Sequence, residues 1–374
     1  MQESITPGPR ERRTDQAWAA PERLWPRPAA PPGPGDAPLP ALTELDLAVV
    51  NALQIQPRAP WSLVGEVLGV DAATVARRWK RLSDSGTAWV DGYWPPADDG
   101  QVRAQVEIVT EADRSWEIGR IIAHDPETMS VKHTSGARDL LAIVWAYDMD
   151  GLVDYIGGRI AGLPGVRLTR THVITGAPFE GSRWRLRSLS AGQRARLAPP
   201  AAPARPEPVT AVDRRIAVAL GEDGRMPLAE LARRAGTSVA TVGRRVRRLV
   251  GSGQFVLRCS LARPLTGWPV SVVYFASVPA EHLDAATASL RTLPELRLCT
   301  VTAGPHNLIL DVWLRGVPEV HTLEAHLVQE LAHLRFRVDD RVMVLRTEKN
   351  VGRVLDRRGR SLRAVPMELP EALT

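Results

Sequence analysis

The stretch SVATVGRRVRRLV, residues 238–250, decides how the rest of the 374-residue chain is interpreted. Its apolar residues Val242, Val246 and Leu249 recur at steps of four and three, which predicts a helix with one narrow apolar stripe. Ser238 precedes the first turn, where its hydroxyl can accept a hydrogen bond from a free backbone N–H. The stretch therefore predicts an amphipathic helix that begins directly after Ser238.

The polar side of this predicted helix is rich in arginine, with Thr241, Arg244, Arg245 and Arg248 beside or opposite the apolar stripe. Arginine neutralises phosphate and can pair with guanine through two hydrogen bonds, while an apolar back holds the helix on its own domain. We therefore predict that these four residues enter the major groove of double-stranded DNA, with Ser238 near a phosphate. Basic amphipathic helices also bind membranes and acidic partners, so the neighbouring segments must decide.

The segments before this helix complete a helix-turn-helix pattern. Residues 209–220 have apolar positions at helical spacing, Pro227 is placed to start a short helix over 228–235, and Gly236 and Thr237 form a turn. Helix, helix, tight turn and basic helix follow one another in the order of a helix-turn-helix domain, whose last helix contacts DNA.

The same pattern occurs earlier in the chain at a constant offset, which is a strong sign of internal duplication. Residues 42–53 match 209–220, and Gly86 lies 167 positions before Gly253, at the end of the last helix. Three further pairs at this offset are Asp46 with Asp213, Arg58 with Arg225, and Pro60 with Pro227.

The first copy would place Thr74, Arg77, Arg78 and Arg81 against DNA. Asp71 stands where the second copy has a serine. It can still cap the helix, but its charge would repel a nearby phosphate. We therefore expect the first copy to be the weaker DNA binder.

The segments that follow each helix-turn-helix unit have the periodicity of a β-α-β-β-α-β order, which is typical of a ferredoxin-like domain. In the first half, strands are expected at 102–108, 129–134, 140–146 and 166–174, and helices at 116–123 and 151–162. In the second half, strands are expected at 270–277, 296–302, 308–314 and 336–345, and helices at 280–292 and 317–332. The predicted fold class is α+β, with two winged-type helix-turn-helix domains that alternate with two ferredoxin-like βαββαβ domains.

The predicted domain boundaries follow changes in composition. Residues 1–40 are expected to form a disordered Pro/Arg-rich arm, 181–208 a Pro/Ala linker, and 349–374 a mobile basic tail. The folded domains are expected at 41–95 and 209–260 for the helix-turn-helix units, and at 100–180 and 268–348 for the ferredoxin-like units.

Composition argues against several other classes of protein. The formal net charge of +6 suits a polyanionic partner. Cys259 and Cys299 lie in apolar runs without a CxxC motif, so neither a disulfide framework nor a metal site is predicted. No stretch approaches the roughly 20 apolar residues of a membrane-spanning helix, and the N-terminus has no apolar signal core. The sequence predicts a cytoplasmic, nucleoid-associated protein with no catalytic residue, no metal and no cofactor.

These residues resemble the Lrp/AsnC family of prokaryotic transcription regulators. In the first half the resemblance is carried by Leu45, Arg58, Leu68, Thr74, Arg78, Leu82, Ser85 and Gly86, and by a Thr-x-Gly-x-x-Asp loop in the sheet domain. In the second half it is carried by Ser238, Thr241, Val242, Arg245, Leu249, Ser252 and Gly253. The resemblance implies a sequence-specific DNA-binding transcriptional regulator whose small domains bind amino-acid effectors and pair their sheets to form dimers.

In that family the effector contacts centre on the loop between the two middle strands. Carried over to this chain, the resemblance implies Ser135, Gly136 and Asp139 in the first half, and Ala303, Gly304 and Asn307 in the second. Asn307 departs from the acidic pattern and offers an α-ammonium only neutral polar groups. In the second half a tight turn made by glycine is the preferred explanation, and in the first half turn and effector site stay open alternatives.

Because the unit is duplicated, the sheet pairing that the family forms between chains could form here within one chain. We expect an intrachain pseudo-dimer with two DNA-binding units (DNA readers) that differ in sequence. Such pseudo-dimers could assemble further into homo-oligomers. Since the order of half-sites mirrors the symmetry of the protein, such a chain would accept asymmetric half-sites.

Two other functions stay open. The two-domain architecture of this chain also resembles that of the sirohaem decarboxylases. The chemistry of those enzymes would need His, Arg or Tyr groups that converge on a tetrapyrrole pocket. The histidines of the two predicted sheet domains form no dense motif of that kind. The third hypothesis is a non-catalytic scaffold protein. Under this hypothesis the chain would show no salt-dependent retention on DNA.

Overall fold

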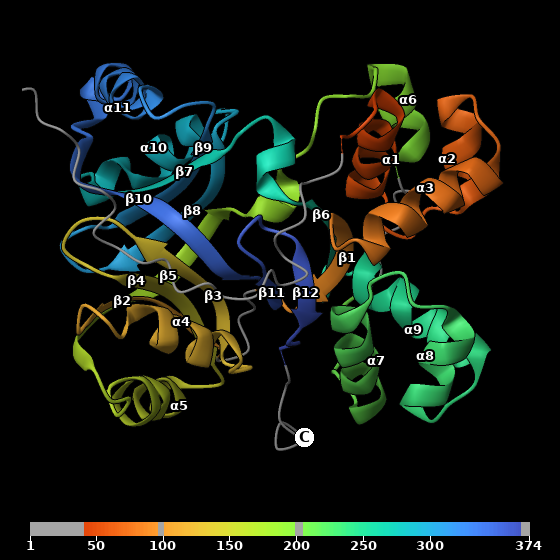
Figure 1. Cartoon of the computed structure of the whole chain (residues 1–374), viewed down its shortest axis with the longest axis horizontal. Helices are drawn as coiled ribbons and strands as arrows, with labels where there is room; N and C mark the ends of the chain where they lie inside the picture. The colour runs from red at the N-terminus through yellow and green to blue at the C-terminus, as the bar shows by residue number, and fades with distance from the viewer. Residues whose placement is uncertain (1–40, 96–100, 199–204, 368–374) are drawn as a thin grey trace, which may run out of the picture.

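The computed structural model describes residues 41–95, 101–198 and 205–367. The predicted N-terminal arm, residues 1–40, lies outside the described residues. Figure 1 shows two groups of helices on one side of the molecule and a large, helix-covered sheet on the other. Within the described ranges, no helix combines the length and apolarity that a membrane crossing requires.

Each half of the chain begins with the three helices of a helix-turn-helix unit, as predicted. The units consist of α1 (Glu44–Ile55), α2 (Trp61–Leu68) and α3 (Ala72–Asp84), and of α7 (Ala211–Glu222), α8 (Leu228–Ala235) and α9 (Val239–Gly251). The predicted apolar stripe of α9, formed by Val242, Val246 and Leu249, is buried in the core of its unit. Helical spacing therefore predicted correctly which side of α9 faces its domain.

The predicted ends of the two recognition helices, α3 and α9, are also confirmed. Ser238 Oγ accepts a hydrogen bond from Thr241 N at 3.2 Å, and Asp71 Oδ1 accepts one from Thr74 N at 2.7 Å. After α9, Gly253 has a φ of 76°, in the left-handed region that favours glycine. Both helices are thus delimited by residues that a local sequence pattern can identify.

One strand from each helix-turn-helix unit pairs with the other to form a two-stranded antiparallel sheet. β1 (Ala88–Tyr93) follows α3, β6 (Val256–Leu261) follows α9, and Trp89 lies opposite Ser260. This differs from the predicted winged type, in which each unit would have its own sheet. Because each unit contributes only one strand, that strand has no partner inside its own unit. Its backbone N–H and C=O groups form hydrogen bonds with the strand of the other unit.

A reciprocal pair of arginines also joins the two units. Arg58 Nη1 donates a hydrogen bond to Gly224 O at 2.7 Å, and Arg225 Nη1 donates one to Pro57 O at 2.6 Å. The remaining donations, both at 3.0 Å, run from Arg58 to Met226 O and from Arg225 to Ala59 O. Burial lowers the pKa of Arg225 to about 10, which leaves the guanidinium charged at neutral pH. The duplicated positions Arg58 and Arg225 therefore hold the two units in one relative orientation.

Most of the remaining elements form two sheet units in the order strand, helix, strand, strand, helix, strand. The first contains β2 (Val102–Thr110), α4 (Ser115–Ala123), β3 (Thr128–Thr134), β4 (Leu140–Ala146), α5 (Met149–Val153) with a π-helical continuation at Asp154–Ile160, and β5 (Val166–Phe179). The second contains β7 (Val270–Ser277), α10 (Leu283–Leu290), β8 (Leu296–Ala303), β9 (Leu308–Leu314), α11 (Glu319–Glu330) and β10 (Arg337–Asn350).

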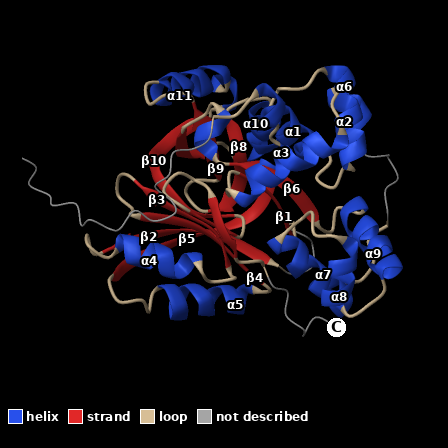
Figure 2. Ribbon diagram, turned by 45° about the vertical axis from the view of Figure 1, so that its right-hand side comes forward, coloured by secondary structure: helices blue, strands red, loops and turns tan. Residues whose placement is uncertain are grey.

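The sheets of the two halves join into one closed sheet. β5 pairs with β8, and β10 pairs with both β3 and β7, so eight strands form a ring in the order β10-β3-β4-β2-β5-β8-β9-β7. Figure 2 shows the strands gathered at the centre of this region with α4, α5 and α11 outside them. An apolar layer inside the ring is formed by Leu141, Val273, Phe275, Ile309, Val342 and Val344. Closure pairs the edge strands of one half with those of the other half within the chain. In a protein with a single sheet unit, these edge strands would need a second chain as their partner.

The structure differs from the predicted linker, 181–208, in the described residues 181–198. α6 (Ala191–Leu197) begins there, with reciprocal cap hydrogen bonds between Ser190 and Gln193 at 3.2 and 3.0 Å. Three buried leucines of the segment pack against the first helix-turn-helix unit, namely Leu186, Leu189 and Leu197. The proline and alanine content of the segment predicted a linker, so the packing of these leucines on the first helix-turn-helix unit was not predicted.

The described part of the predicted mobile tail, residues 349–367, is ordered, and the remainder of the predicted tail lies outside the described residues. β11 (Arg353–Leu355) pairs with β10, and β12 (Ser361–Ala364) pairs with β11. Arg353 is buried and donates a hydrogen bond to Glu222 O, and the buried Arg360 lies 2.7 Å from the Asp356 carboxylate. A high arginine content suggested exposure, but backbone carbonyls and a carboxylate within reach allow these charges to be buried.

Candidate functional site

Only part of each predicted DNA-facing set lies on an open surface. Arg244 on α9 and Arg77 on α3 are exposed at equivalent positions of the two recognition helices. Ser238 is exposed at the N-terminus of α9, and Thr241 is half-buried one turn further on. The open side of each recognition helix thus presents a small polar residue near its start and an arginine in its second turn.

A buried aspartate of α7 holds two of the other predicted DNA-reading arginines. The carboxylate of Asp213 is fully buried and lies 2.9 Å from Arg245 Nη1 and 2.8 Å from Arg248 Nη2. Arg248 also lies 2.5 Å from the Glu207 carboxylate. Burial alone would raise the pKa of Asp213, but hydrogen bonds from Thr210 and from the two guanidinium groups outweigh it and lower the pKa. Arg245 and Arg248 therefore fasten α9 to α7.

The first unit repeats these ion pairs, but Arg81 is an exposed residue, with 54% of its side chain accessible against 14% for Arg248. Asp46 Oδ1 lies 3.0 Å from Arg78 Nη1 and 2.7 Å from Arg81 Nη2. Arg77 Nη2 donates a hydrogen bond to Thr74 Oγ1 at 3.1 Å, on the exposed side of α3. An aspartate in the first turn of a helix looks like an ordinary cap residue, and for that reason the sequence did not reveal its second role.

The loop between β3 and β4 holds the effector residues predicted for the first half. Asp139 Oδ2 accepts hydrogen bonds from Thr110 N at 2.7 Å and Thr110 Oγ1 at 3.2 Å, so its carboxylate fastens the end of β2. Ser135 exchanges hydrogen bonds of 2.9 and 3.0 Å with the backbone of Met343 in β10. Gly136 has a φ of 90°, which favours glycine. The structure brings these three residues together in a loop that contacts the other half of the chain.

The equivalent loop between β8 and β9 is built in a similar way. Asn307 Oδ1 accepts a hydrogen bond from Val278 N at 3.1 Å, and its Nδ2 donates one to Val278 O at 2.7 Å. Ala303 pairs with Val173 of β5, and Gly304 follows with a φ of 154°. The amide of Asn307 therefore fastens the end of β7, the role that a carboxylate has in the first half.

A charged network that sequence reasoning missed lies inside the ring next to the first of these loops. Arg138 Nε lies 2.5 Å from Glu107 Oε2, and its Nη2 lies 2.6 Å from Asp340 Oδ2. His172 Nε2 lies 2.7 Å from Glu107 Oε1. Burial raises the pKa of Glu107, but His172 and Arg138 outweigh this effect and lower it. Alternation suggested that this face of β2 is solvated, whereas ring closure buries it.

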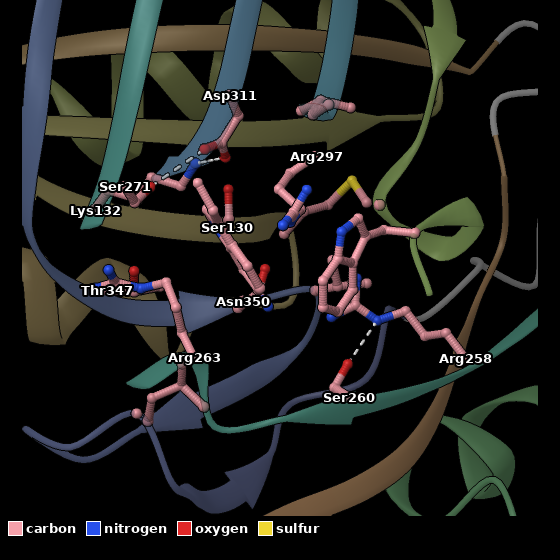
Figure 3. Close-up of a pocket in the computed structure, with 18 of the residues that line it drawn as sticks. Ser130, Lys132, Arg258, Ser260, Arg263, Ser271, Arg297, Asp311, Thr347 and Asn350 are labelled. Carbon is pink, nitrogen blue, oxygen red and sulfur yellow. Dashed lines mark hydrogen bonds and ion pairs between the residues drawn. The ribbon is translucent and has the colours of Figure 1, made fainter. Parts of the chain in front are cut away.

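A cavity of about 220 Å³ lies where the ring meets the two-stranded sheet β1–β6 (Figure 3). Nine arginine and lysine side chains line it, against three carboxylates, and its aromatic lining consists of Trp89, Tyr93, Trp184 and Trp313. The volume is several times the roughly 30 Å³ that one water molecule occupies in the liquid. The cavity can therefore hold a small organic molecule.

Cationic side chains reach this cavity from both halves of the chain. Lys132 on β3 pairs with Asp311 on β9, and Ser271 Oγ lies 3.3 Å from the same carboxylate. Arg297 on β8 is 5% exposed, and Figure 3 shows it on the same side of the cavity as Asp311. In the sequence these residues look like the solvated face of half-buried strands, so only the closure of the ring reveals that they face a shared interior.

Groups that could hold a metal or act as a nucleophile are scarce in this region. Across residues 41–95, 101–198 and 205–367, no three His, Cys, Asp or Glu side chains are arranged to hold a metal ion. Cys259 lines the cavity, but burial raises the pKa of its thiol far above the ordinary value. The thiol is therefore neutral at physiological pH and a weak nucleophile.

Two helix-turn-helix units joined to a duplicated α+β sheet region place the chain among the helix-turn-helix proteins. The AsnC-type helix-turn-helix domain matches residues 42–83 and 209–250, and the Lrp/AsnC ligand binding domain matches residues 103–184. An uncharacterized HTH-type transcriptional regulator of Pyrococcus abyssi is 30% identical over 125 residues, which are 33% of this chain and 77% of that protein. The chain belongs to the Lrp/AsnC family of transcriptional regulators.

Two further comparisons extend this result. The proline dehydrogenase transcriptional activator of Rhodobacter capsulatus is 26% identical over 130 residues, which are 34% of this chain and 84% of that protein. The solved structure of the sirohaem decarboxylase NirDL, in complex with an iron-uroporphyrin III analogue, matches 83% of this chain and 93% of its own, with a TM-score of 0.55 and 13% identity. At that identity the likeness concerns the fold alone.

Proposed function

We propose that this chain is a sequence-specific DNA-binding transcriptional regulator whose two helix-turn-helix units contact unlike half-sites. One observation carries the proposal: two complete units lie in one chain, with an exposed arginine at the same place on each recognition helix, Arg77 and Arg244. Relatives that are named transcriptional regulators support it. The pairing of β5 with β8 and of β10 with β3 means that one chain can supply both readers.

In this proposal the arginines have two different roles. Arg244 contacts base edges, with Thr241 beside it and Ser238 near a phosphate. Arg245 and Arg248 position α9 on its domain, and they can add phosphate contacts without leaving Asp213, because each guanidinium has five donors.

The first unit contacts DNA with the same division of roles. Arg77 is the candidate for a base contact, and Thr74 lies beside it. Arg78 and Arg81, both held by Asp46, are positioning residues. The charge of the Asp71 cap makes this unit the weaker reader.

The proposed regulation is by an amino acid or similar small effector bound at the ferredoxin-like units. The family places effectors at the loops that contain Asp139 and Asn307, and both side chains are already bonded to a strand end. An effector there would use backbone groups and remaining lone pairs. It would change DNA binding only to the extent that it binds two arrangements of the chain with different affinity.

Replacing Arg244 with alanine is expected to weaken binding to a DNA site selected from a random pool. The loss of one base-reading arginine should amount to about 1–3 kcal/mol, or roughly 5- to 150-fold, and should relax specificity at one position. Fluorescence anisotropy at fixed salt concentration measures it. Arg77→Ala should give a smaller loss, and Arg337→Ala, on an exposed part of β10, should give none. Unchanged affinity in both helix variants would refute the assigned DNA-facing surface.

The cationic cavity and the fold likeness to NirDL favour one second candidate, an enzyme that acts on a tetrapyrrole. Among the described residues that line the cavity there is no histidine, so proton transfer would fall on Tyr93, on Lys132 or on one of the carboxylates Glu180, Asp311 and Asp356. Tyr93 donates a hydrogen bond to Glu180 at 2.7 Å, and Lys132 is paired with Asp311. Incubation with sirohaem under reducing conditions, followed by mass spectrometry, separates the two functions. Loss of carboxylate groups from sirohaem would identify an enzyme.

A further inference from the structure

We propose that the cavity between the ring and the β1–β6 sheet is a binding site for a flat, conjugated organic anion that carries carboxylate or phosphate groups. This site is separate from the effector loops that the family resemblance indicates, since none of their six residues lines it. Three features of the cavity support the proposal: its charge, an incompletely paired arginine and its aromatic walls.

The charge of the cavity is not balanced by its own carboxylates. Nine cationic side chains line it, and each of the three carboxylates already has a partner. Asp311 pairs with Lys132, and Asp356 lies 2.7 Å from Arg360. The third, Glu180, accepts the hydrogen bond from Tyr93. Two of the lining arginines, Arg258 and Arg346, pair with carboxylates outside the lining, Asp91 and Glu348. The cations without an ion pair to a described carboxylate include Arg185, Arg263, Arg297 and Arg357, and this excess of positive charge favours an anionic occupant.

Arg297 supplies the most specific anion-binding group. Its Nη1 donates hydrogen bonds to Pro294 O at 2.8 Å and Leu296 O at 2.9 Å, which fix the guanidinium in place. Its Nε and Nη2 are buried and have no hydrogen-bond partner among the described residues. A buried donor without a partner is costly, and an acceptor oxygen of a ligand would remove that cost. Burial lowers the pKa of Arg297 to about 9, so the group remains a cation at neutral pH.

The aromatic side chains that line the cavity are the reason why we propose a flat ligand. The guanidinium carbon of Arg297 lies 4.1 Å from the ring centre of Trp184 and 4.6 Å from that of Trp313. The two indoles lie 5.6 Å apart at 60° to each other. Indole faces and planar guanidinium groups both stack on conjugated rings, so a ligand that combines an aromatic body with acidic groups matches both components.

The two halves contribute unlike residues to this cavity, so it is a single asymmetric site. At the 168-position offset between the sheet units, Arg297 corresponds to Met129, and Lys132 corresponds to Thr300. All four residues line the cavity. A dimer of identical units would present each of these groups twice, whereas this chain presents one of each. We therefore expect one ligand per chain in one orientation.

The position of the cavity also suggests a consequence for DNA binding, which rests on the proposed function. Trp89 of β1 and Arg258 of β6 line it, and these strands join the two helix-turn-helix units. A ligand held between this sheet and the ring would stabilise one orientation of the DNA readers. The coupling requires that the ligand distinguish that orientation from others.

Naphthalene-2,6-dicarboxylate and 2-naphthyl phosphate test the site with the full chain. Calorimetry and quenching of tryptophan fluorescence should show 1:1 binding of one or both, and which one binds distinguishes carboxylate from phosphate recognition. The neutral 2-naphthalenemethanol and the aliphatic dianion succinate should bind at least tenfold more weakly. Absence of binding of both aromatic anions at millimolar concentration overturns the proposal, as does equal binding of the neutral compound.

Arg297→Gln should weaken probe binding at least tenfold, and Arg337→Gln, on the exposed start of β10 and outside the cavity lining, should leave it unchanged. If Arg297→Gln does not fold, Arg357→Glu on the exposed rim is the substitute, and a severalfold, salt-dependent loss is expected. Probe affinity that is unchanged in every cavity variant that folds would refute the site. DNA affinity is measured separately with and without probe, so a chain that binds probe but not DNA contradicts the proposed function and not the site.

Discussion

Replacing Asp213 with alanine is expected to destabilise the second helix-turn-helix unit by about 3 kcal/mol. The carboxylate is fully buried, and its removal leaves Arg245 and Arg248, 23% and 14% exposed, without their shared partner. It also removes the acceptor for Thr210 N at the start of α7. Because both guanidinium groups retain some contact with water, the loss should lie at the lower end of the range for broken buried ion pairs. Native-state hydrogen exchange of the α7 and α9 amides measures it.

Two variants separate charge from capping in this prediction. Asp213→Asn keeps a neutral acceptor for the cap and should lose less stability than Asp213→Ala. Asp46→Ala is the matched change in the first unit and should affect α1 and α3 in the same way. Wild-type exchange rates in both alanine variants would show that these ion pairs do not stabilise the units.

The same aspartate gives stability a defined dependence on pH. Its folded pKa lies below the ordinary value of 3.8, so its contribution is fully present above that value and is lost as the pH falls through the lower, folded pKa. Asp213→Asn lacks this component. Acidification below pH 4 should therefore destabilise the wild-type unit more steeply than the variant, and equal slopes would contradict the assignment.

The parts of the fold that the sequence predicted are those that depend on local patterns. The stripe of Val242, Val246 and Leu249, the cap at Ser238 and the glycine at 253 define α9 within about fifteen residues. The 167-position repeat then assigns the first unit by comparison. These patterns can be recognised in the sequence because helix caps and helical spacing depend on residues that are close together in the chain.

The parts that the sequence did not predict depend on contacts between the halves. Glu107 and Arg297 alternate with apolar residues as solvated positions would, and only ring closure turns them inward. The second role of Asp213 requires α9 to pack on α7, and Arg353 requires a carbonyl 131 positions away. The cavity was missed for the same reason, because its lining comes from strands of both halves that no local pattern brings together.

Gly86→Ala and Gly253→Ala are expected to differ strongly in stability, although they are the same change at equivalent positions. Both glycines lie in the left-handed region, with φ of 65° and 76°, where an added Cβ costs about 1–2 kcal/mol. At Gly253 nothing lies within 4 Å of that Cβ, so the backbone term is the whole effect. At Gly86 the Cβ would lie 2.3 Å from Ser361 O, a contact that real structures do not contain.

The clash at Gly86 cannot be relieved by rotating a side chain, because both partners are backbone. Ser361 N donates a hydrogen bond to Gly86 O at 2.8 Å, so β12 is held at this point and would have to move away. Overpacking of this kind adds about 1–3 kcal/mol, which brings the expected loss for Gly86→Ala to roughly 2–5 kcal/mol. Denaturant unfolding gives the difference between the two variants, and hydrogen exchange in β11 and β12 should increase in Gly86→Ala alone. Equal losses in the two variants would mean that the C-terminal strands do not dock on the first helix-turn-helix unit in solution.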